Sequence, residues 1–236
     1  MTYPLKRSCA FAALGLILAL LAHPASGQIV GGVINTSFQN KPAESREAIQ
    51  EEFQALLAQA LSPKNVAEVT ALSSRLARVL EQTTYLTDFD DVTAPCLFSD
   101  TEGPLYGRHQ NAFFSGFNGN GGAILDQCSN FGVDAFSQPN FLAFNRLNNP
   151  PPGAFILPEL IVVGPDKSNV SLWVSGGALS GYPIAAIAIG QHAVKGMVTT
   201  TTTSDWVQLT LSAPGIQSVL LVGNPAWLVV DNIEAQ

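Results

Sequence analysis

The chain has 236 residues, of which 11 are Lys or Arg and 18 are Asp or Glu, and its formal net charge is −7. Only 12% of the residues are charged, while 47% are hydrophobic. An acidic chain without a cluster of basic residues is a poor ligand for polyanions. Nucleic acids and anionic membrane surfaces are therefore excluded as expected partners.

The N-terminal segment has the pattern of an export signal. Lys6 and Arg7 precede an apolar run over 10–22 that is short for a membrane span, and Ala25-Ser-Gly27 offers small residues for cleavage. We predict a signal peptide over 1–27, no membrane anchor after its removal, and a secreted or periplasmic protein. Nine basic and 18 acidic residues then remain, a formal charge of −9. Residues 28–41, rich in Gly, Asn, Thr and Ser, are expected to form a flexible lead-in.

Residues 42–82 have the periodicity of two amphipathic helices. Apolar residues recur at intervals of three and four from Ile49 to Leu61 and again from Val66 to Leu80. Ser62-Pro63 separates the runs, with Ser as the cap and Pro as the first residue of the second helix. The pattern predicts a helical hairpin whose apolar faces cover each other, the rest of the chain, or a second copy. A homo-oligomer formed through 42–82 is therefore one of the open alternatives.

Beyond residue 83 the composition shifts to β-branched residues, aromatics, Gly, Pro and Asn. About eleven short strands without interleaved helices predict an antiparallel β-sandwich of the jelly-roll kind over 84–236. We expect turns at Gly164-Pro-Asp-Lys167 and at Gly223-Asn-Pro225. The strands are expected near 85–90, 112–117, 123–126, 140–145, 159–163, 168–175, 183–190, 193–200, 205–212, 217–222 and 227–233.

Two further features bear on the core. Four phenylalanines, which lie close together, are expected to pack in the main core because of their apolar area: Phe131, Phe136, Phe141 and Phe144. Cys96 and Cys128 are the two cysteines left after cleavage, and in an exported protein they predict one structural disulfide. A metal site made from them is disfavoured because no histidine pair lies nearby.

Several segments resemble a known group of domains: Thr87-Asp-Phe-Asp-Asp-Val92, Gly121 to Val133, Pro139 to Asn145, Trp206-Val-Gln-Leu209 and Trp227 to Ile233. They resemble secreted bacterial sandwich domains frequent among proteins with a PEP-CTERM sorting tail, whose fold is similar to galactose-binding-like and carbohydrate-binding modules. The resemblance covers about 84–234 and implies a fold more than an activity. The sequence ends at Gln236 without a sorting tail, which favours a soluble exported protein.

The resemblance also implies a structural Ca²⁺ between the first and last strands. The matching ligands are Asp90, Asp91 and Asp231, with main-chain carbonyls and Glu102 completing the shell. Calcium takes six to eight oxygen ligands, which carboxylates and carbonyls supply. The alternative is that these acidic residues at strand ends are simply solvated or bonded to backbone amides.

Nothing in the sequence predicts catalysis. The predicted mature chain has only His109 and His192, and it lacks the Gly-x-Ser-x-Gly motif of serine hydrolases. A glycoside hydrolase would need two facing carboxylates. Sequence alone cannot pair any of the candidates, which are Glu102, Asp126, Asp134, Glu159 and Asp166.

The aromatic residues favour a binding protein. Tyr106, Tyr182 and Trp227 adjoin Gly or Pro turns, so we predict that they are accessible and bind carbohydrate, whereas Trp173 and Trp206 lie in alternating strands and are expected to be buried. The predicted function is an exported, non-catalytic binding or adhesion module for extracellular carbohydrate. The alternative is a structural, self-associating extracellular protein without a small ligand.

Overall fold

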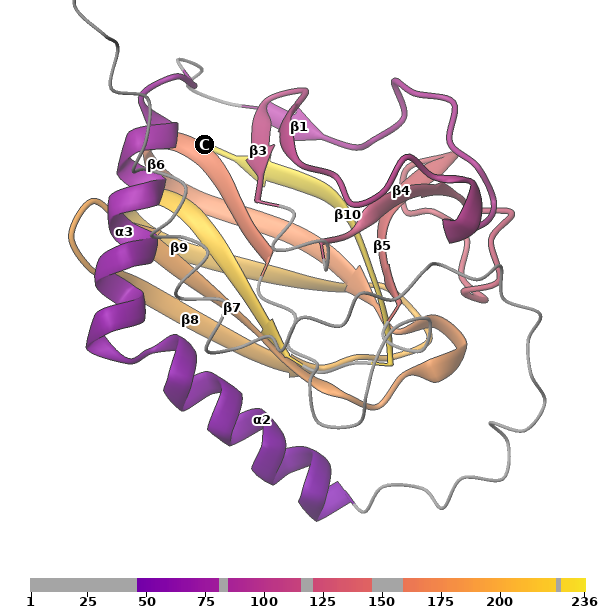
Figure 1. Cartoon of the computed structure of the whole chain (residues 1–236), viewed down its shortest axis with the longest axis horizontal. Coiled ribbons are helices and arrows are strands. Elements are labelled where there is room, and N and C mark those ends of the chain that lie inside the picture. Colours follow the sequence, from indigo (N-terminus) through magenta and orange to yellow (C-terminus); the bar gives the residue numbers. More distant parts are fainter. Residues whose placement is uncertain (1–45, 81–84, 116–120, 146–158, 224–225) are drawn as a thin grey trace, which may run out of the picture.

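The computed structural model describes residues 46–80, 85–115, 121–145, 159–223 and 226–236. The predicted signal peptide (1–27) and lead-in (28–41) lie outside these residues. Two α-helices come first and ten strands follow (Figure 1). The helices are α2 (Arg46–Ala60) and α3 (Pro63–Ala77), and the strands are β1 (Tyr85–Thr87), β2 (Gly107–His109), β3 (Ala112–Phe114), β4 (Ala123–Asp126), β5 (Asn140–Asn145), β6 (Glu159–Ser175), β7 (Pro183–Gly190), β8 (Val194–Thr201), β9 (Val207–Gly223) and β10 (Trp227–Ala235).

The strands form two antiparallel layers that share β6 and β9. The first half of β6 pairs with β3 and with the second half of β9, which continues through β7 to β8. The second half of β6 pairs with the first half of β9 and with β10, which continues through β5 to β4. One buried core includes inward-facing residues of both layers, among them Ile161, Val219, Leu172 and Val230. The predicted antiparallel β-sandwich, preceded by two helices, is confirmed.

Both shared strands bend where they pass from one layer to the other. Sequence analysis expected a turn at 164–167, but the chain continues as β6, and the β6/β9 register shifts between Val162 and Lys167. Gly164 (φ 94°) and Asp166 (φ 52°) have left-handed backbone conformations, as does Gly215 (φ 75°) on β9. These bulges re-aim the strands without reversing them.

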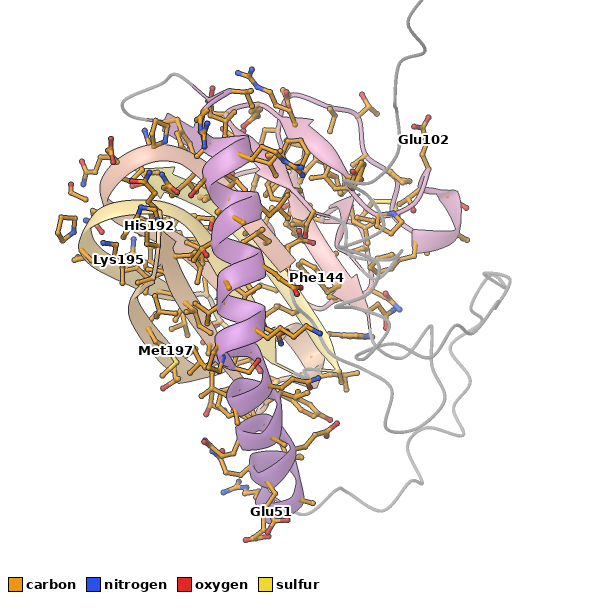
Figure 2. The ribbon with its side chains drawn as sticks, turned by 60° about the vertical axis from the view of Figure 1, so that its left-hand side comes forward. Glu51, Glu102, Phe144, His192, Lys195 and Met197 are labelled. Carbon is orange, nitrogen blue, oxygen red and sulfur yellow. A yellow bond between two sulfur atoms is a disulfide. The ribbon has the colours of Figure 1, made fainter. Side chains whose placement is uncertain are left out.

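Both helices pack on the outer face of the first layer (Figure 1). Phe53, Leu56 and Leu57 of α2 belong to the same buried cluster as Leu160 of β6 and Ile187 of β7. Figure 2 shows α2 running past the sheet towards Glu51, with Met197 of β8 to one side of the helices. None of the helices in the described ranges is long and apolar enough to cross a membrane.

Small residues let α3 lie close to the sheet. Ser73 and Ala77 are fully buried in this interface. The Ser73 and Ser218 hydroxyls lie 2.7 Å apart and share a hydrogen bond, and the Ser74 hydroxyl donates to Gln217 Oε1 at 2.9 Å. The helices are thus part of the sandwich's packing within one chain.

The outer face of the second layer is covered at one end by the loop over 127–139. Phe131 and Ala135 of this loop pack with Leu125, Phe141 and Val229 in a third cluster. The predicted disulfide between Cys96 and Cys128, with Cα atoms 5.3 Å apart, fastens the loop to the segment after β1. The rest of this outer face, along β6 and β9, carries the site described next.

Candidate functional site

Three aromatic rings gather on the outer face of the second layer, and we call Phe136, Trp173 and Trp206 the aromatic patch. Phe136 stacks on Trp173 with ring centroids 4.1 Å apart and an interplanar angle of 18°. Trp206 meets Phe136 edge-on at 6.0 Å. Phe136 is 41% exposed and the two tryptophans are half-buried. The patch therefore presents aromatic surface to solvent on a rigid support.

The patch is assembled from three elements that are far apart in the sequence. Trp173 lies in β6, Trp206 immediately precedes β9, and Phe136 comes from the loop over 127–139. The Trp206 indole Nε1 donates to the Asp134 carbonyl at 2.9 Å, which ties the loop to β9. Next to Phe136, the Ser137 amide donates to Asp231 Oδ2 at 3.0 Å, which ties the loop to β10.

Hydrogen-bonding side chains surround the patch. Trp173 is paired across the strands with Gln208 on one side and Asp231 on the other, so the three side chains share the outer face. Gln208 and Thr210 are exposed on this face of β9. Exposed rings beside amide and hydroxyl groups can bind a ligand that has both apolar faces and hydroxyl edges.

Of the three burial expectations for the patch residues, the one for Phe136 was wrong, and the two tryptophans are only partly buried. Phe136 was assigned to the core, yet only Phe131, Phe141 and Phe144 of the four phenylalanines are buried. Trp173 was expected to be buried, although it lies between Leu172 and Val174, which face the core. The alternation itself indicates the opposite, outer face for Trp173.

The residues predicted to bind carbohydrate do not form one site in the described structure. Tyr106 is 62% exposed and contacts Phe113 edge-on at 6.2 Å. Tyr182 is half-buried before β7, and Trp227 packs on Phe131 with centroids 5.0 Å apart. The ring contacts found among the described residues connect none of these three side chains to another, so their role stays a prediction.

Two of the predicted calcium ligands, Asp90 and Asp91, contact different residues. Asp90 Oδ1 accepts from the Asn140 amide at 3.0 Å, while Asp91 Oδ1 contacts His109 Nε2 at 3.1 Å. Within the described residues, Asp90, Asp91 and Asp231 do not bring their oxygens within 4.8 Å of one another as a group of three. Glu102 lies exposed, away from the helices (Figure 2).

Asp231 is fully buried in the middle of the second layer. Burial raises the pKa of its carboxyl to about 7, and the negative charge of Asp90 adds to the rise. Hydrogen bonds from the Asn232 and Ser137 amides oppose the rise in pKa. The charged form is therefore held by two amides and a hydroxyl but has no cationic side chain among its described contacts.

A buried side-chain oxygen belongs to Asn140, the residue whose main-chain amide binds Asp90. Asn140 is fully buried, and its Nδ2 donates to the carbonyls of Phe89 (2.9 Å) and Val92 (2.8 Å), but its Oδ1 has no hydrogen-bond donor in the described structure. Phe89 (φ 66°) and Asn232 (φ 44°), the neighbours of Asp90 and Asp231, have left-handed backbones. A bulky residue such as Phe89 rarely takes this conformation, and such strain often accompanies a ligand site.

Two of the five carboxylates considered for a hydrolase have structural contacts. Glu159 Oε1 accepts from the Ser115 amide and hydroxyl at 2.9 and 2.8 Å, and it is buried. Asp126 Oδ1 accepts from the Cys128 amide at 2.7 Å beside the disulfide.

Comparisons with known proteins give only distant likenesses. No protein-family model and no curated protein sequence matches the chain. Among solved structures, the K1 cleaved adhesin domain of Lys-gingipain from Porphyromonas gingivalis is 11% identical over 66% of this chain and 98% of its own, with a TM-score of 0.42. The module TmCBM61, solved with β-1,4-galactotriose, is 13% identical over 64% and 98%, with a TM-score of 0.39. A family 29 carbohydrate-binding module from Piromyces equi is 10% identical over 65% and 91%, with a TM-score of 0.27. With these TM-scores below 0.5, none of the three likenesses assigns a function to the chain.

Proposed function

We propose that the chain is an exported, non-catalytic carbohydrate-binding module of the galactose-binding-like kind, and that the aromatic patch is its binding site. The observation that carries the proposal is the stack of Phe136 on Trp173, exposed on a sheet face beside Gln208 and Thr210. The faces of a pyranose ring are lined by C–H groups and its edges by hydroxyls. Aromatic rings bind the faces, and amide and hydroxyl side chains bind the edges.

The support of the patch suits binding more than covalent chemistry. Sheet strands hold Trp173, and the Trp206 indole is fixed by its hydrogen bond to Asp134. Preorganised rings lose little conformational entropy when a ligand binds, which favours affinity. No proton transfer or nucleophile is needed for this function.

The proposal is tested by titrating the full chain with soluble polysaccharides. Binding is measured by tryptophan fluorescence and by calorimetry. Phe136→Ala removes the outermost ring and should weaken binding about tenfold or more, as expected for a buried aromatic contact. Tyr106→Ala is the matched control, because it removes an exposed ring elsewhere on the molecule. If Tyr106→Ala loses affinity and Phe136→Ala does not, the patch is the wrong site. If no polysaccharide binds, the proposed function fails.

We also propose a structural Ca²⁺ site near Asp90 and Asp231, with Asn140 Oδ1 as a third ligand. The Asn140 amide binds Asp90, whose charge acts on Asp231, and Asn140 Oδ1 is buried without a described partner. Carboxylate and amide oxygens are the ligands that calcium prefers. Main-chain carbonyls would complete the shell. The ion would neutralise the two carboxylates and fasten the loop after β1 to β10.

Thermal unfolding in EDTA and then in Ca²⁺ tests this site. Calcium that binds only the folded state should raise the unfolding midpoint. Asp231→Ala and the half-exposed Asp90→Ala should each abolish the rise, and the second variant serves if the first is too unstable to study. An unchanged midpoint in the wild-type protein would show that these carboxylates bind no calcium.

A further inference from the structure

Within the described residues, the strands of the layer that carries the aromatic patch and the loop over 127–139 contain no Lys or Arg beyond the bend of β6. The sequence contains no Lys or Arg over 109–145, 168–194 or 196–236. These segments form β4, β5, β7, β10, the second half of β6, all of β9 and the loop over 127–139. The described segments that build the patch thus supply no cationic side chain to it.

The other described cations lie on other parts of the fold, and Arg108 of β2 donates from its Nε to the Gln110 carbonyl at 3.1 Å. Lys167 is 1% exposed at the bend of β6, with its Nζ over the Tyr85 ring at 5.4 Å. Lys195 lies at the β7 to β8 hairpin beside His192 (Figure 2). The four described cations on the helices, Arg46, Lys64, Arg75 and Arg78, are on the outer side of the other layer.

Carboxylates, in contrast, flank Trp206. Asp134 supplies the carbonyl that accepts the Trp206 indole proton, and Asp205 precedes Trp206 in the chain. Both residues are exposed, and neither side chain has an ion-pair or hydrogen-bond partner within the described ranges. Two exposed carboxylates without a described partner therefore belong to residues that adjoin Trp206.

We propose that the aromatic patch selects a cationic carbohydrate, namely a polymer of 2-amino-2-deoxy sugars with free amino groups. This inference rests on the proposed function and names the ligand class of the same site. Ammonium groups are attracted by aromatic faces and by unpaired carboxylates, and both are present here. Uronic-acid and sulfated glycans would be repelled, because the described residues of the site offer them carboxylates and no cation.

The test compares two ligands that share a backbone. The hexamer of β-1,4-linked glucosamine and the hexamer of β-1,4-linked N-acetylglucosamine are titrated into the full chain in a slightly acidic buffer. We expect the glucosamine hexamer to bind about tenfold more tightly at low ionic strength. This preference should shrink between about 50 and about 500 mM NaCl, because salt screens exposed charges.

Variants distinguish the contribution of the carboxylates to binding from that of the aromatic rings. The double variant Asp134→Asn, Asp205→Asn should bring the two affinities close together, because it removes charge while leaving the rings and the Asp134 carbonyl in place. Phe136→Ala should weaken the binding of both ligands. Polylysine is the control for simple polycation adsorption, and its binding should not depend on Phe136.

The outcomes are distinguishable. Equal affinity for the two hexamers overturns the inference and leaves the proposed function standing for neutral glycans. Binding of the glucosamine hexamer that Phe136→Ala does not weaken also overturns it, since the ligand then adsorbs to acidic surface elsewhere. Failure of every glycan to bind overturns the proposed function itself.

Discussion

The buried carboxyl of Asp231, at the centre of the second layer, makes the stability of the fold depend on pH. The pKa of Asp231 is raised to about 7 in the folded protein, whereas in the unfolded chain it is near 3.8. Between these values the folded state binds a proton that the unfolded state does not. The free energy of unfolding must therefore fall as the pH rises from about 4 to about 7, in the absence of a bound cation.

Urea unfolding in EDTA at several pH values measures this effect. Asp231→Asn should flatten the decline in stability, because the amide is neutral at every pH. Asp205→Asn, at an exposed position, is the control and should keep the decline. A wild-type stability that rises between pH 4 and 7 would contradict the assignment.

Gly177 is a second residue whose replacement should lower the free energy of unfolding. Its φ is +52°, and a Cβ atom built there would lie 2.0 Å from the Phe131 carbonyl oxygen. Gly177→Ala should destabilise the protein by more than about 2 kcal/mol, because it adds backbone strain to a clash with main chain. Gly196→Ala on β8 meets nothing within 4 Å and should be nearly neutral. The unfolding midpoints of the two variants give the comparison, and equal midpoints would contradict it.

For single residues, the sequence predicted the disulfide pairing correctly, but it did not predict which aromatic side chains are exposed. The Cys96 to Cys128 disulfide followed from compartment and cysteine count. The exposure of Phe136 did not follow, because its burial depends on how far the loop over 127–139 extends beyond the third cluster. Trp173 and Trp206 could have been placed outside the core, since Leu172 and Leu209 alternate with them.

The loop over 127–139 is the element on which the site depends. It carries Phe136 and is fastened by the disulfide, whose cysteines are both exposed and 32 residues apart in the sequence. Replacing Cys96 and Cys128 by Ser should lower the free energy of unfolding by about 3 to 4 kcal/mol in the chain-entropy model. Urea unfolding of the double variant measures the loss, and reduction of the wild-type protein should reproduce it. Unchanged midpoints in both cases would show that the hydrogen bonds of Trp206 and Ser137 hold the loop without the disulfide.

Strand positions were predicted well and strand continuity was not. Alternation marks the second half of β6 and the first half of β9, and apolar runs mark the other two halves, but Gly164-Pro-Asp-Lys167 has the residue chemistry of a turn. Whether such a segment reverses the chain or only bends it is decided by the partner strand. Here Lys167 stays paired with Ile216, so β6 continues.

The helices cover an apolar sheet face that could not exist exposed in a soluble molecule. Beneath them lie Leu160, Val162, Ile187, Leu220 and Val222. Deletion of residues 46–80 should therefore produce aggregates or larger assemblies, measured by light scattering after size-exclusion chromatography. If the intact protein is an oligomer and the deletion yields monomers, the helices join copies of the chain instead, which is the alternative that the sequence left open.

The position of β10 determines when the second layer can fold during synthesis. This strand is the last to be synthesised among those described, yet it lies between β5 and β6 and also pairs Ala235 with Tyr85 of β1. The second layer cannot close until its final strand has left the ribosome. Long-range pairing of this kind makes folding slow. A nascent chain that stays unfolded through synthesis is in the state that a transport channel for unfolded polypeptides accepts, so this strand order would suit the proposed export.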